Sequence, residues 1–329
     1  MKQLKIISGA AVRQLVTLED LFEPMRSALT EFSSGTAFQH PRVTVEPPGE
    51  GGRVLLMPAG EPESAAFGLK VLSMFPRSAE KGLPSVQGLI VLLDGVHGEV
   101  LAVLDGTVVT ELRTAAVSAV GTDCLARQDA EVLAVIGAGV QAKAHIAALR
   151  SIRPWREVRV HSRRPERARE LVAWAEAQGQ PARLADSSDA AVRGADVLVT
   201  ATSALEPVVS AAAVAAEGCH ITAVGAFGPA CRELPTEVVE RCTVFAESRD
   251  ALRREAGDLL IPVSEGRLPE DHPVVEIGDI LAGRQGGRTD ARETTLFKSL
   301  GLPIEDVVAS HLVYRRALAA GAGDDVDFF

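Results

Sequence analysis

The spacing of hydrophobic and polar positions changes along the chain, and each spacing predicts a different element. Apolar residues recur at helical intervals from Thr17 to Phe32, where Thr17 and Asp20 are typical of a helix start and Gly35 ends the pattern. Short β-rich runs follow, and turn residues at 94–98 predict a hairpin between the last two. Neighbours joined in this way predict an antiparallel sheet, with strands over 42–46, 53–58, 66–75, 87–93 and 99–104.

From residue 110 the pattern becomes an alternation of helices and strands. An Ala-rich helix is predicted over 110–128, and a last helix over 303–320 has Pro303 at its start and Gly321 after its end. Connections of crossover length join parallel strands, so the region predicts a doubly wound, Rossmann-type sheet. Its predicted strands cover 132–136, 157–161, 196–200, 220–224 and 243–246.

The length of 329 residues predicts two domains, because it exceeds what one hydrophobic core usually supports. We expect an α/β protein whose Rossmann domain covers 117–302. The last helix follows that unit and can pack back on the first sheet, which predicts a discontinuous α+β domain made of 1–116 with 303–329.

The charge balance narrows the classes of partner. A net charge of −10 and a pI near 5.3 give no general attraction for phosphate backbones or anionic lipid. No leader pattern opens the chain and no apolar run has membrane-spanning length, so we expect a cytoplasmic protein without nucleic-acid or membrane partners. The cysteines are too widely spaced for a metal or redox pair, and no His, Cys and Asp cluster has ligand spacing, so no metal is expected.

A glycine-rich turn follows the predicted strand over 132–136. Gly137 permits a tight turn, Gly139 lets the backbone approach a pyrophosphate, and Ala142 lets the next helix pack closely. Amides at the helix start then face the anion. Glycines of an ordinary turn are the alternative, but the order strand, turn and helix favours a dinucleotide site.

The end of the next predicted strand indicates which dinucleotide binds. NAD sites usually have an acidic residue there for the ribose hydroxyl, whereas this chain has Ser162, Arg163 and Arg164, with Arg167 one helical turn later. Guanidinium groups offer forked donors to a phosphate. We therefore predict NADP(H) in preference to NAD(H); a solvated helix start is the alternative.

Three basic residues in or beside predicted strands indicate an anion pocket in the first domain. They are Arg42, Lys70 and Arg113. Lys70 is the most informative, because a lysine within an apolar strand is costly to desolvate unless it meets an anion. Arg42 or Lys70 taken alone could be an outward-facing side chain, but together the three predict a site for a substrate carboxylate.

With these residues identified, the chain resembles the ornithine cyclodeaminase/mu-crystallin family along nearly its whole length. The resemblance implies an NAD(P)H-dependent oxidoreductase acting on C–N bonds, a homodimer built through the sheet domain, and active sites between the two domains. The matching stretches occur in family order: PRVTV, LLMPA, GLKVLSMFP, KGLPSVQGLIVLLD, GEVLAVLDGTVVTELRTAAVSAV, VIGAGVQA, ADVLVTAT, VGAFGPACREL and TTLFKSLG.

The resemblance also implies roles for individual residues. Arg42, Lys70 and Arg113 match positions that hold and orient the substrate, with Lys70 and Arg113 as the catalytic pair. Besides Gly137 and Gly139, the cofactor positions implied are Ser85, Arg113, Ala138, Val140, Gln141, Ser162, Arg163, Arg164, Thr202, Val224 and Ser299.

One position departs from the family pattern. Phe227 stands where ornithine cyclodeaminases have an aspartate, and a phenyl ring neither accepts a proton nor pairs with an ammonium. The resemblance therefore favours the ketimine reductase branch, with Phe227 as an apolar wall for a cyclic imine or as plain packing. We expect reduction of Δ1-pyrroline-2-carboxylate or Δ1-piperideine-2-carboxylate to L-proline or L-pipecolate. The alternatives are an ornithine cyclodeaminase or amino-acid dehydrogenase, and a non-catalytic NADP(H)-dependent protein that binds a small ligand.

Overall fold

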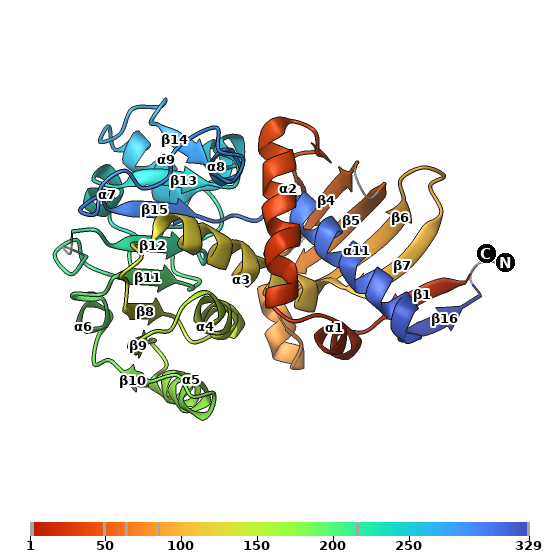
Figure 1. Cartoon of the computed structure of the whole chain (residues 1–329), viewed down its shortest axis with the longest axis horizontal. Coiled ribbons are helices and arrows are strands. Elements are labelled where there is room, and N and C mark those ends of the chain that lie inside the picture. Colours follow the sequence, from red (N-terminus) through yellow and green to blue (C-terminus); the bar gives the residue numbers. More distant parts are fainter. Residues whose placement is uncertain (1–2, 49–50, 63–64, 85, 215–216, 328–329) are drawn as a thin grey trace. The chain divides into compact units, whose positions relative to one another are not determined.

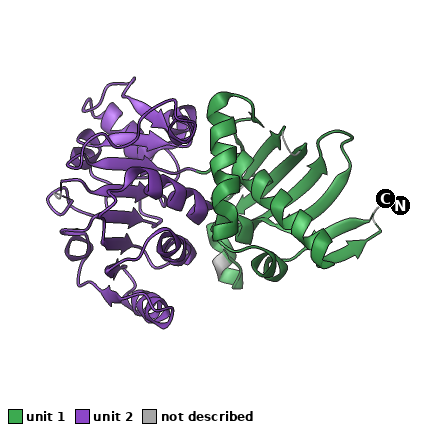
Figure 2. Cartoon of the chain, in the orientation of Figure 1, with its two compact units in different colours: residues 1–113, 301–329 green, residues 114–300 purple. Residues whose placement is uncertain are grey.

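The computed structural model describes residues 3–48, 51–62, 65–84, 86–214 and 217–327. The chain divides into two compact units, which we call unit 1, residues 1–113 with 301–329, and unit 2, residues 114–300 (Figure 2). Each unit has its own eight-stranded sheet. The predicted α/β class is confirmed.

Unit 1 is a mixed sheet with α2 and α11 lying on one of its faces (Figure 1). The strand order is β16-β1-β7-β6-β5-β4-β2, and β3 pairs with β4. The predicted antiparallel neighbours are confirmed, but the parallel pairing of β1 with β7 was not predicted. The elements are β1 Leu4–Ile7, α1 Gly9–Leu15, η1 Glu19–Leu21, α2 Phe22–Ser34, β2 Phe38–Gln39, β3 Val43–Val45, β4 Arg53–Glu61, β5 Ala66–Met74, η2 Pro76–Lys81, β6 Val86–Asp94, β7 Val100–Asp105, α11 Pro303–Ala320 and β16 Asp324–Val326.

Alternation along β5 fixes which side chains face the helices. A Cβ on Gly68 would lie 3.0 Å from Val307 of α11, so Gly68 and Lys70 lie on the face that this helix covers. Leu69 therefore points to the opposite face. The bounds predicted for α11 are confirmed, and Gly321 ends the helix in the left-handed conformation.

The helix predicted from Thr17 is wrong at its start. Asp20 does accept hydrogen bonds from the amide and hydroxyl of Thr17, at 2.8 and 2.9 Å, but these bonds close a turn before the helix. A short 3-10 segment, η1, comes next, and α2 begins at Phe22. The capping signal was therefore real, but it belongs to the turn that leads into the helix.

Unit 2 is a doubly wound parallel sheet of order β10-β9-β8-β11-β12-β15-β13-β14, and every pairing in it is parallel. Its neighbours β9 and β11 lie on opposite sides of β8, so the chain reverses its direction of winding there, where ligands bind in such sheets. The elements are α3 Gly106–Leu125, which begins in unit 1, β8 Val132–Ile136, α4 Val140–Ile152, β9 Glu157–His161, α5 Pro165–Ala177, β10 Ala182–Leu184, α6 Ser188–Val192, β11 Val197–Thr200, β12 His220–Ala223, α7 Thr236–Glu240, β13 Thr243–Ala246, α8 Arg249–Glu255, α9 Gly257–Ser264, β14 Val274–Glu276, α10 Ile277–Leu281 and β15 Thr295–Lys298.

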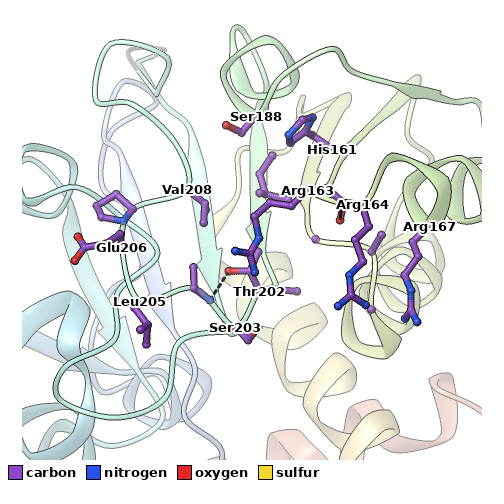
Figure 3. A pocket seen from close by; sticks show the side chains of 18 residues that line it. His161, Arg163, Arg164, Arg167, Ser188, Thr202, Ser203, Leu205, Glu206 and Val208 are labelled. Atoms are coloured by element: carbon purple, nitrogen blue, oxygen red, sulfur yellow. Dashed lines mark hydrogen bonds between the residues drawn. The ribbon is translucent and has the colours of Figure 1, made fainter. Parts of the chain in front are cut away.

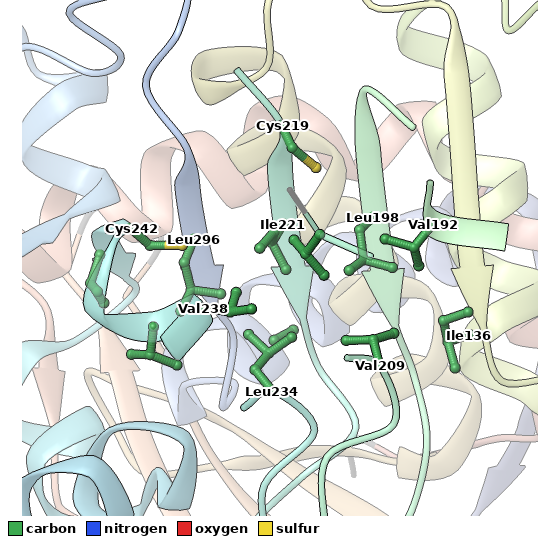
Figure 4. Close-up of a cluster of buried hydrophobic side chains, with 14 of the residues drawn as sticks. Ile136, Val192, Leu198, Val209, Cys219, Ile221, Leu234, Val238, Cys242 and Leu296 are labelled. Atoms are coloured by element: carbon green, nitrogen blue, oxygen red, sulfur yellow. The ribbon is translucent and has the colours of Figure 1, made fainter. Parts of the chain in front are cut away.

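The core of unit 2 lies against this sheet and includes two of the cysteines (Figure 4). Cys219 and Cys242 are free thiols beside Ile221 and Leu296, and burial raises the pKa of each to about 12, so both stay neutral. Within the described ranges, no three His, Cys, Asp or Glu side chains lie where they could hold a metal ion. None of the helices described has the length and apolar composition needed to cross a membrane.

Candidate active site

The loop after β8 has the conformation of a pyrophosphate-binding turn. Gly137 has φ of +120°, and a Cβ there would lie 2.4 Å from the carbonyl oxygen of Ala201. Gly139 precedes α4, and a Cβ there would meet no atom within 4 Å, so its backbone faces open space. No side chain caps the first amides of α4. The turn therefore presents amide donors and the positive end of a helix to an anion.

A cavity of about 760 Å³ lies beside this turn and contains the predicted arginines (Figure 3). Arg163 extends toward Thr202 of the loop after β11, while Arg164 and Arg167 lie next to each other at the start of α5. All three are exposed, and none forms an ion pair with another described residue. The hydroxyl of Ser162 accepts a hydrogen bond from the Arg164 amide at 3.3 Å. The cavity therefore combines an anion-binding turn with unneutralised guanidinium groups.

The other predicted cofactor residues of the first βα unit have different surroundings. Ala138 lines the cavity, and Val140 is 60% exposed at the start of α4. The Oε1 atom of Gln141 is buried and has no hydrogen-bond partner among the described residues. Ser85 lies outside the described residues.

A buried carboxylate that the sequence analysis missed connects the loops after β11 and β12. Glu233 is fully buried, and its Oε1 accepts from the amide and hydroxyl of Thr202 at 2.8 and 2.7 Å. Its Oε2 accepts from the amides of Gly225 and Ala226 at 2.7 and 3.1 Å. Burial raises the pKa of Glu233, and the charge of Lys298 opposes this rise. One side chain thus fixes the cavity wall at Thr202 to the loop that carries Phe227.

Val224, Phe227 and Ser299 do not line this cavity. Val224 and Phe227 are half-buried at the end of β12 and in the loop that follows. Ser299 is buried after β15, and its hydroxyl donates to Glu247 at 2.5 Å. The hydroxyl of Ser299 therefore has a partner within unit 2.

In unit 1 two of the predicted cations meet two buried carboxylates. Lys70 on β5 has its Nζ 2.5 Å from Oδ2 of Asp306. Arg113 on α3 donates through Nε to Oδ1 of Asp306 at 3.0 Å and through Nη1 to Oε2 of Glu305 at 2.6 Å. All four side chains are at most 4% exposed. These are buried, hydrogen-bonded ion pairs rather than outward-facing charges.

The third cation, Arg42, lies close enough for its charge to lower the pKa of Lys70. It precedes β3 and donates to the carbonyl oxygen of Gly301 at 2.8 Å. Burial lowers the pKa of Lys70 to about 8; attraction to Asp306 opposes the fall, whereas repulsion from Arg113 and Arg42 adds to it. The structure therefore brings the three predicted cations together and makes Lys70 able to exchange a proton near neutral pH.

Glu305 and Asp306 were not predicted as site residues from the sequence. Both lie in the first turn of α11, where acidic residues are common because they complement the helix dipole. Because of this ordinary explanation, the sequence did not suggest that they pair with Lys70 and Arg113. The sequence did contain one indication of this role. The two acidic residues interrupt a stretch from Leu302 to Val308 that is otherwise apolar.

Residues 3–321 match the model of the ornithine cyclodeaminase/mu-crystallin family. The Δ1-pyrroline-2-carboxylate reductase of Bacillus cereus is 34% identical over 325 residues, which cover 98% of this chain and 99% of the relative. The structure of the Thermococcus litoralis Δ1-pyrroline-2-carboxylate reductase, in complex with NADH and L-proline, is 35% identical with a TM-score of 0.94, covering 98% of this chain and 100% of that one.

A second solved structure has another named activity. An archaeal alanine dehydrogenase dimer with bound NAD is 33% identical with a TM-score of 0.93, covering 99% of this chain and 100% of that one. The family model and both solved structures match residues of unit 1 and of unit 2. The chain is therefore a member of the ornithine cyclodeaminase/mu-crystallin family.

Proposed function

We propose that this protein reduces a cyclic ketimine carboxylate, Δ1-pyrroline-2-carboxylate or Δ1-piperideine-2-carboxylate, to L-proline or L-pipecolate with NADPH. The observation that carries the proposal is the buried Lys70 ammonium, paired with Asp306 and flanked by two guanidinium groups. Such a group supplies both positive charge for a carboxylate and a proton near neutral pH. Relatives that bear the name of Δ1-pyrroline-2-carboxylate reductase support the substrate class.

The cavity of unit 2 fits a dinucleotide. The turn at Gly137 and Gly139 suits the pyrophosphate, and Arg163, Arg164 and Arg167 suit a 2′-phosphate, because no carboxylate at the tip of β9 would repel it. The two solved structures contain NADH and NAD, so the choice of NADPH rests on these arginines. A direct test is to titrate both reduced dinucleotides by calorimetry; tighter binding of NADH would contradict the NADPH assignment.

The residues of unit 1 would bind the substrate and move the proton. Arg42 and Arg113 are suited to hold the carboxylate, since guanidinium groups bind carboxylates through paired donors. Lys70 has one N–H directed to Asp306 and another 3.4 Å from the Thr110 hydroxyl, which leaves a third donor for the ring nitrogen. The hydride that reduces the imine would come from a reduced nicotinamide dinucleotide, which the turn at Gly137 and Gly139 would hold. Lys70 gives the proton that completes the amine, and the neutral lysine then regains a proton from solvent.

Phe227 supports imine reduction over cyclodeamination. Cyclodeamination needs a group that handles two amines, and a phenyl ring offers neither a charge nor a proton acceptor. A preformed cyclic imine needs only orientation, a proton and a hydride.

The test is to follow nicotinamide absorbance with NADPH and each of the two imines. We expect oxidation of NADPH with at least one imine and formation of the L-amino acid. No oxidation with either imine, together with ammonia release from ornithine, would overturn the proposal in favour of a cyclodeaminase. No turnover with any substrate despite NADPH binding would favour a non-catalytic binding protein.

The similarity to an archaeal alanine dehydrogenase favours a second candidate, reductive amination of an open-chain 2-oxo acid. That reaction forms its imine on the enzyme from ammonia, so it depends on ammonium concentration. Reduction of a cyclic imine does not. Turnover of pyruvate with ammonium, at a rate above that of the cyclic imines, would support this candidate instead.

The protein would act as a homodimer assembled through unit 1. On the sheet face opposite α11, cross-strand partners form apolar rows, one of them Val43, Leu56, Val71 and Leu89. Val43 and Leu89 are each 42% exposed, and such a face is suited to a second copy of the chain. Sedimentation of the protein and of a Leu89→Glu variant tests this: we expect a dimer that the charge weakens, and a wild-type monomer would contradict it.

A further inference from the structure

We propose that Asp306 is the positioning residue of the candidate site, because its carboxylate holds the Lys70 ammonium and the Arg113 guanidinium in one fixed arrangement. The proposal deepens the proposed function and rests on it. Glu305, the adjacent residue, contacts the same Arg113 guanidinium and provides a matched control.

The two oxygens of Asp306 have separate partners. Oδ2 lies 2.5 Å from Nζ of Lys70, and Oδ1 accepts from Nε of Arg113 at 3.0 Å. Glu305 contacts Nη1 of the same guanidinium at 2.6 Å. A single carboxylate therefore sets the separation of the group that would give the proton and the group that would bind the carboxylate.

The position of Asp306 makes it rigid. It lies in the first turn of α11, three residues after Pro303, and is 1% exposed. Burial raises the pKa of Asp306, but the charges of Arg113 and Lys70 lower it further than burial raises it, and the net pKa is below its ordinary value. The carboxylate is thus ionised at neutral pH and present as a constant negative charge beside Lys70.

Groups from several elements approach Lys70, and the carboxylate of Asp306 forms an ion pair with it. Lys70 meets the Thr110 hydroxyl and the Arg113 guanidinium from α3. It also meets the charge of Arg42 from the segment before β3. Its cross-strand neighbours on β4 and β6 are the apolar Met57 and Ile90. With burial and two cations acting against the ammonium, loss of the Asp306 charge would release the proton of Lys70 at lower pH.

An Asp306→Asn variant separates charge from shape, because the amide keeps the size and one acceptor oxygen. If Lys70 must be protonated, kcat/KM falls as pH rises through its pKa. We expect this alkaline limb to move to lower pH by about one to three units in the variant, the usual effect of one close opposite charge. Turnover at acidic pH should then recover, which a purely structural role would not produce.

Glu305→Gln is the matched control, with the same chemical change in the same helical turn. It removes the charge that contacts Nη1 of Arg113, so we expect KM for the imine to rise about tenfold or more with the alkaline limb unchanged. Equal shifts of the limb in both variants would overturn the specific role of Asp306.

A second readout is independent of turnover. The chain has six lysines, so a carbon-13 label on the lysine side chains gives a spectrum in which Lys70 can be assigned with a Lys70→Arg variant. The titration midpoint of Lys70 should be lower in Asp306→Asn than in the wild type and unchanged in Glu305→Gln. An unchanged midpoint in Asp306→Asn would refute the inference, whereas a wild type that reduces neither imine refutes only the proposed function.

If Asp306→Asn does not fold, Asp306→Glu decides the matter. The longer side chain keeps the charge but displaces it by one methylene. We expect a normal alkaline limb with kcat reduced about tenfold or more, because misplacement of a catalytic group is costly. Wild-type kcat in this variant would show that the position of the carboxylate does not matter.

Discussion

Each unit contains a buried cluster of acidic and basic side chains, and the two clusters use their charges differently. In unit 2 the carboxylates bind backbone: Glu233 accepts from three main-chain amides, and Asp258 accepts from the amides of Glu233 and Leu234. Lys298 donates to the carbonyl oxygen of Ala226 and pairs with Asp258. In unit 1 the carboxylates of Glu305 and Asp306 bind side-chain cations instead.

This difference indicates two roles for buried charge. A carboxylate that satisfies amides shapes loops, so the unit 2 cluster serves the walls of the dinucleotide cavity. A carboxylate that holds an ammonium fixes a reactive group while leaving it a donor for a ligand. Substitutions in the unit 1 cluster should therefore reduce turnover more than stability. Substitutions in the unit 2 cluster should reduce stability more than turnover.

The largest expected effect is that of Lys70→Met. It removes the proton donor, so kcat/KM for the imine should fall by about 10²–10⁴-fold. Affinity for NADPH should not change, because no residue of the unit 2 cavity is altered. Steady-state kinetics and calorimetry measure both, with Lys81→Met, an exposed site, as the control. Near-normal turnover in Lys70→Met would remove the basis for the contrast.

Lys298→Met should have the largest effect on stability. The substitution leaves Asp258, which is 2% exposed, without its cation, and breaking such a pair costs about 3–5 kcal/mol. Lys70→Met should lower the free energy of unfolding by less, since Asp306 keeps its contact with Arg113. Urea unfolding of the two variants compares the clusters directly. A larger loss of unfolding free energy in Lys70→Met would reverse our assignment of roles.

Glu233→Gln should give a smaller, mixed effect. One oxygen of the carboxylate becomes an amide NH2 group, which cannot accept from Thr202 or from Gly225, and an unsatisfied buried donor costs about 1–3 kcal/mol. Because Glu233 would no longer hold the loop of Thr202 to the loop of Gly225, NADPH affinity should fall about tenfold. Calorimetry and unfolding measure the two effects, and the exposed Glu237→Gln on the same segment is the control. A loss of stability with unchanged affinity would show that the loops do not shape the cavity.

The parts of the fold that the sequence predicted were those with a regular local signal. The turn at Gly137 and the helix over 303–320 follow from residue order alone. β15, Thr295–Lys298, was not predicted, although it lies in the middle of the unit 2 sheet. It follows a long irregular segment, and its sequence Thr-Leu-Phe-Lys has two apolar residues between polar ones, so no regular period identifies it.

The candidate site divides in the same way. Lys70 and Arg113 stood out because a cation in an apolar segment needs a partner. The partners themselves, Glu305 and Asp306, did not, because acids in the first turn of a helix are ordinary. Glu233 is one glutamate in an irregular stretch, and only the three-dimensional approach of two loops gives it a role. Sequence therefore indicated which charges were unusual but not which charges balance them.

The smallest expected effect concerns the dinucleotide. Arg164 is exposed at the start of α5, so its contribution to binding is reduced by solvent, and Arg164→Ser should weaken NADPH about three- to tenfold. NADH lacks the 2′-phosphate and should bind as before. Arg169→Ser, exposed on the same helix but not lining the cavity, should change neither affinity. Equal weakening of both dinucleotides would assign Arg164 to the pyrophosphate or adenosine rather than to the 2′-phosphate. The selection of NADPH would then rest on Arg163 and Arg167, which line the same cavity.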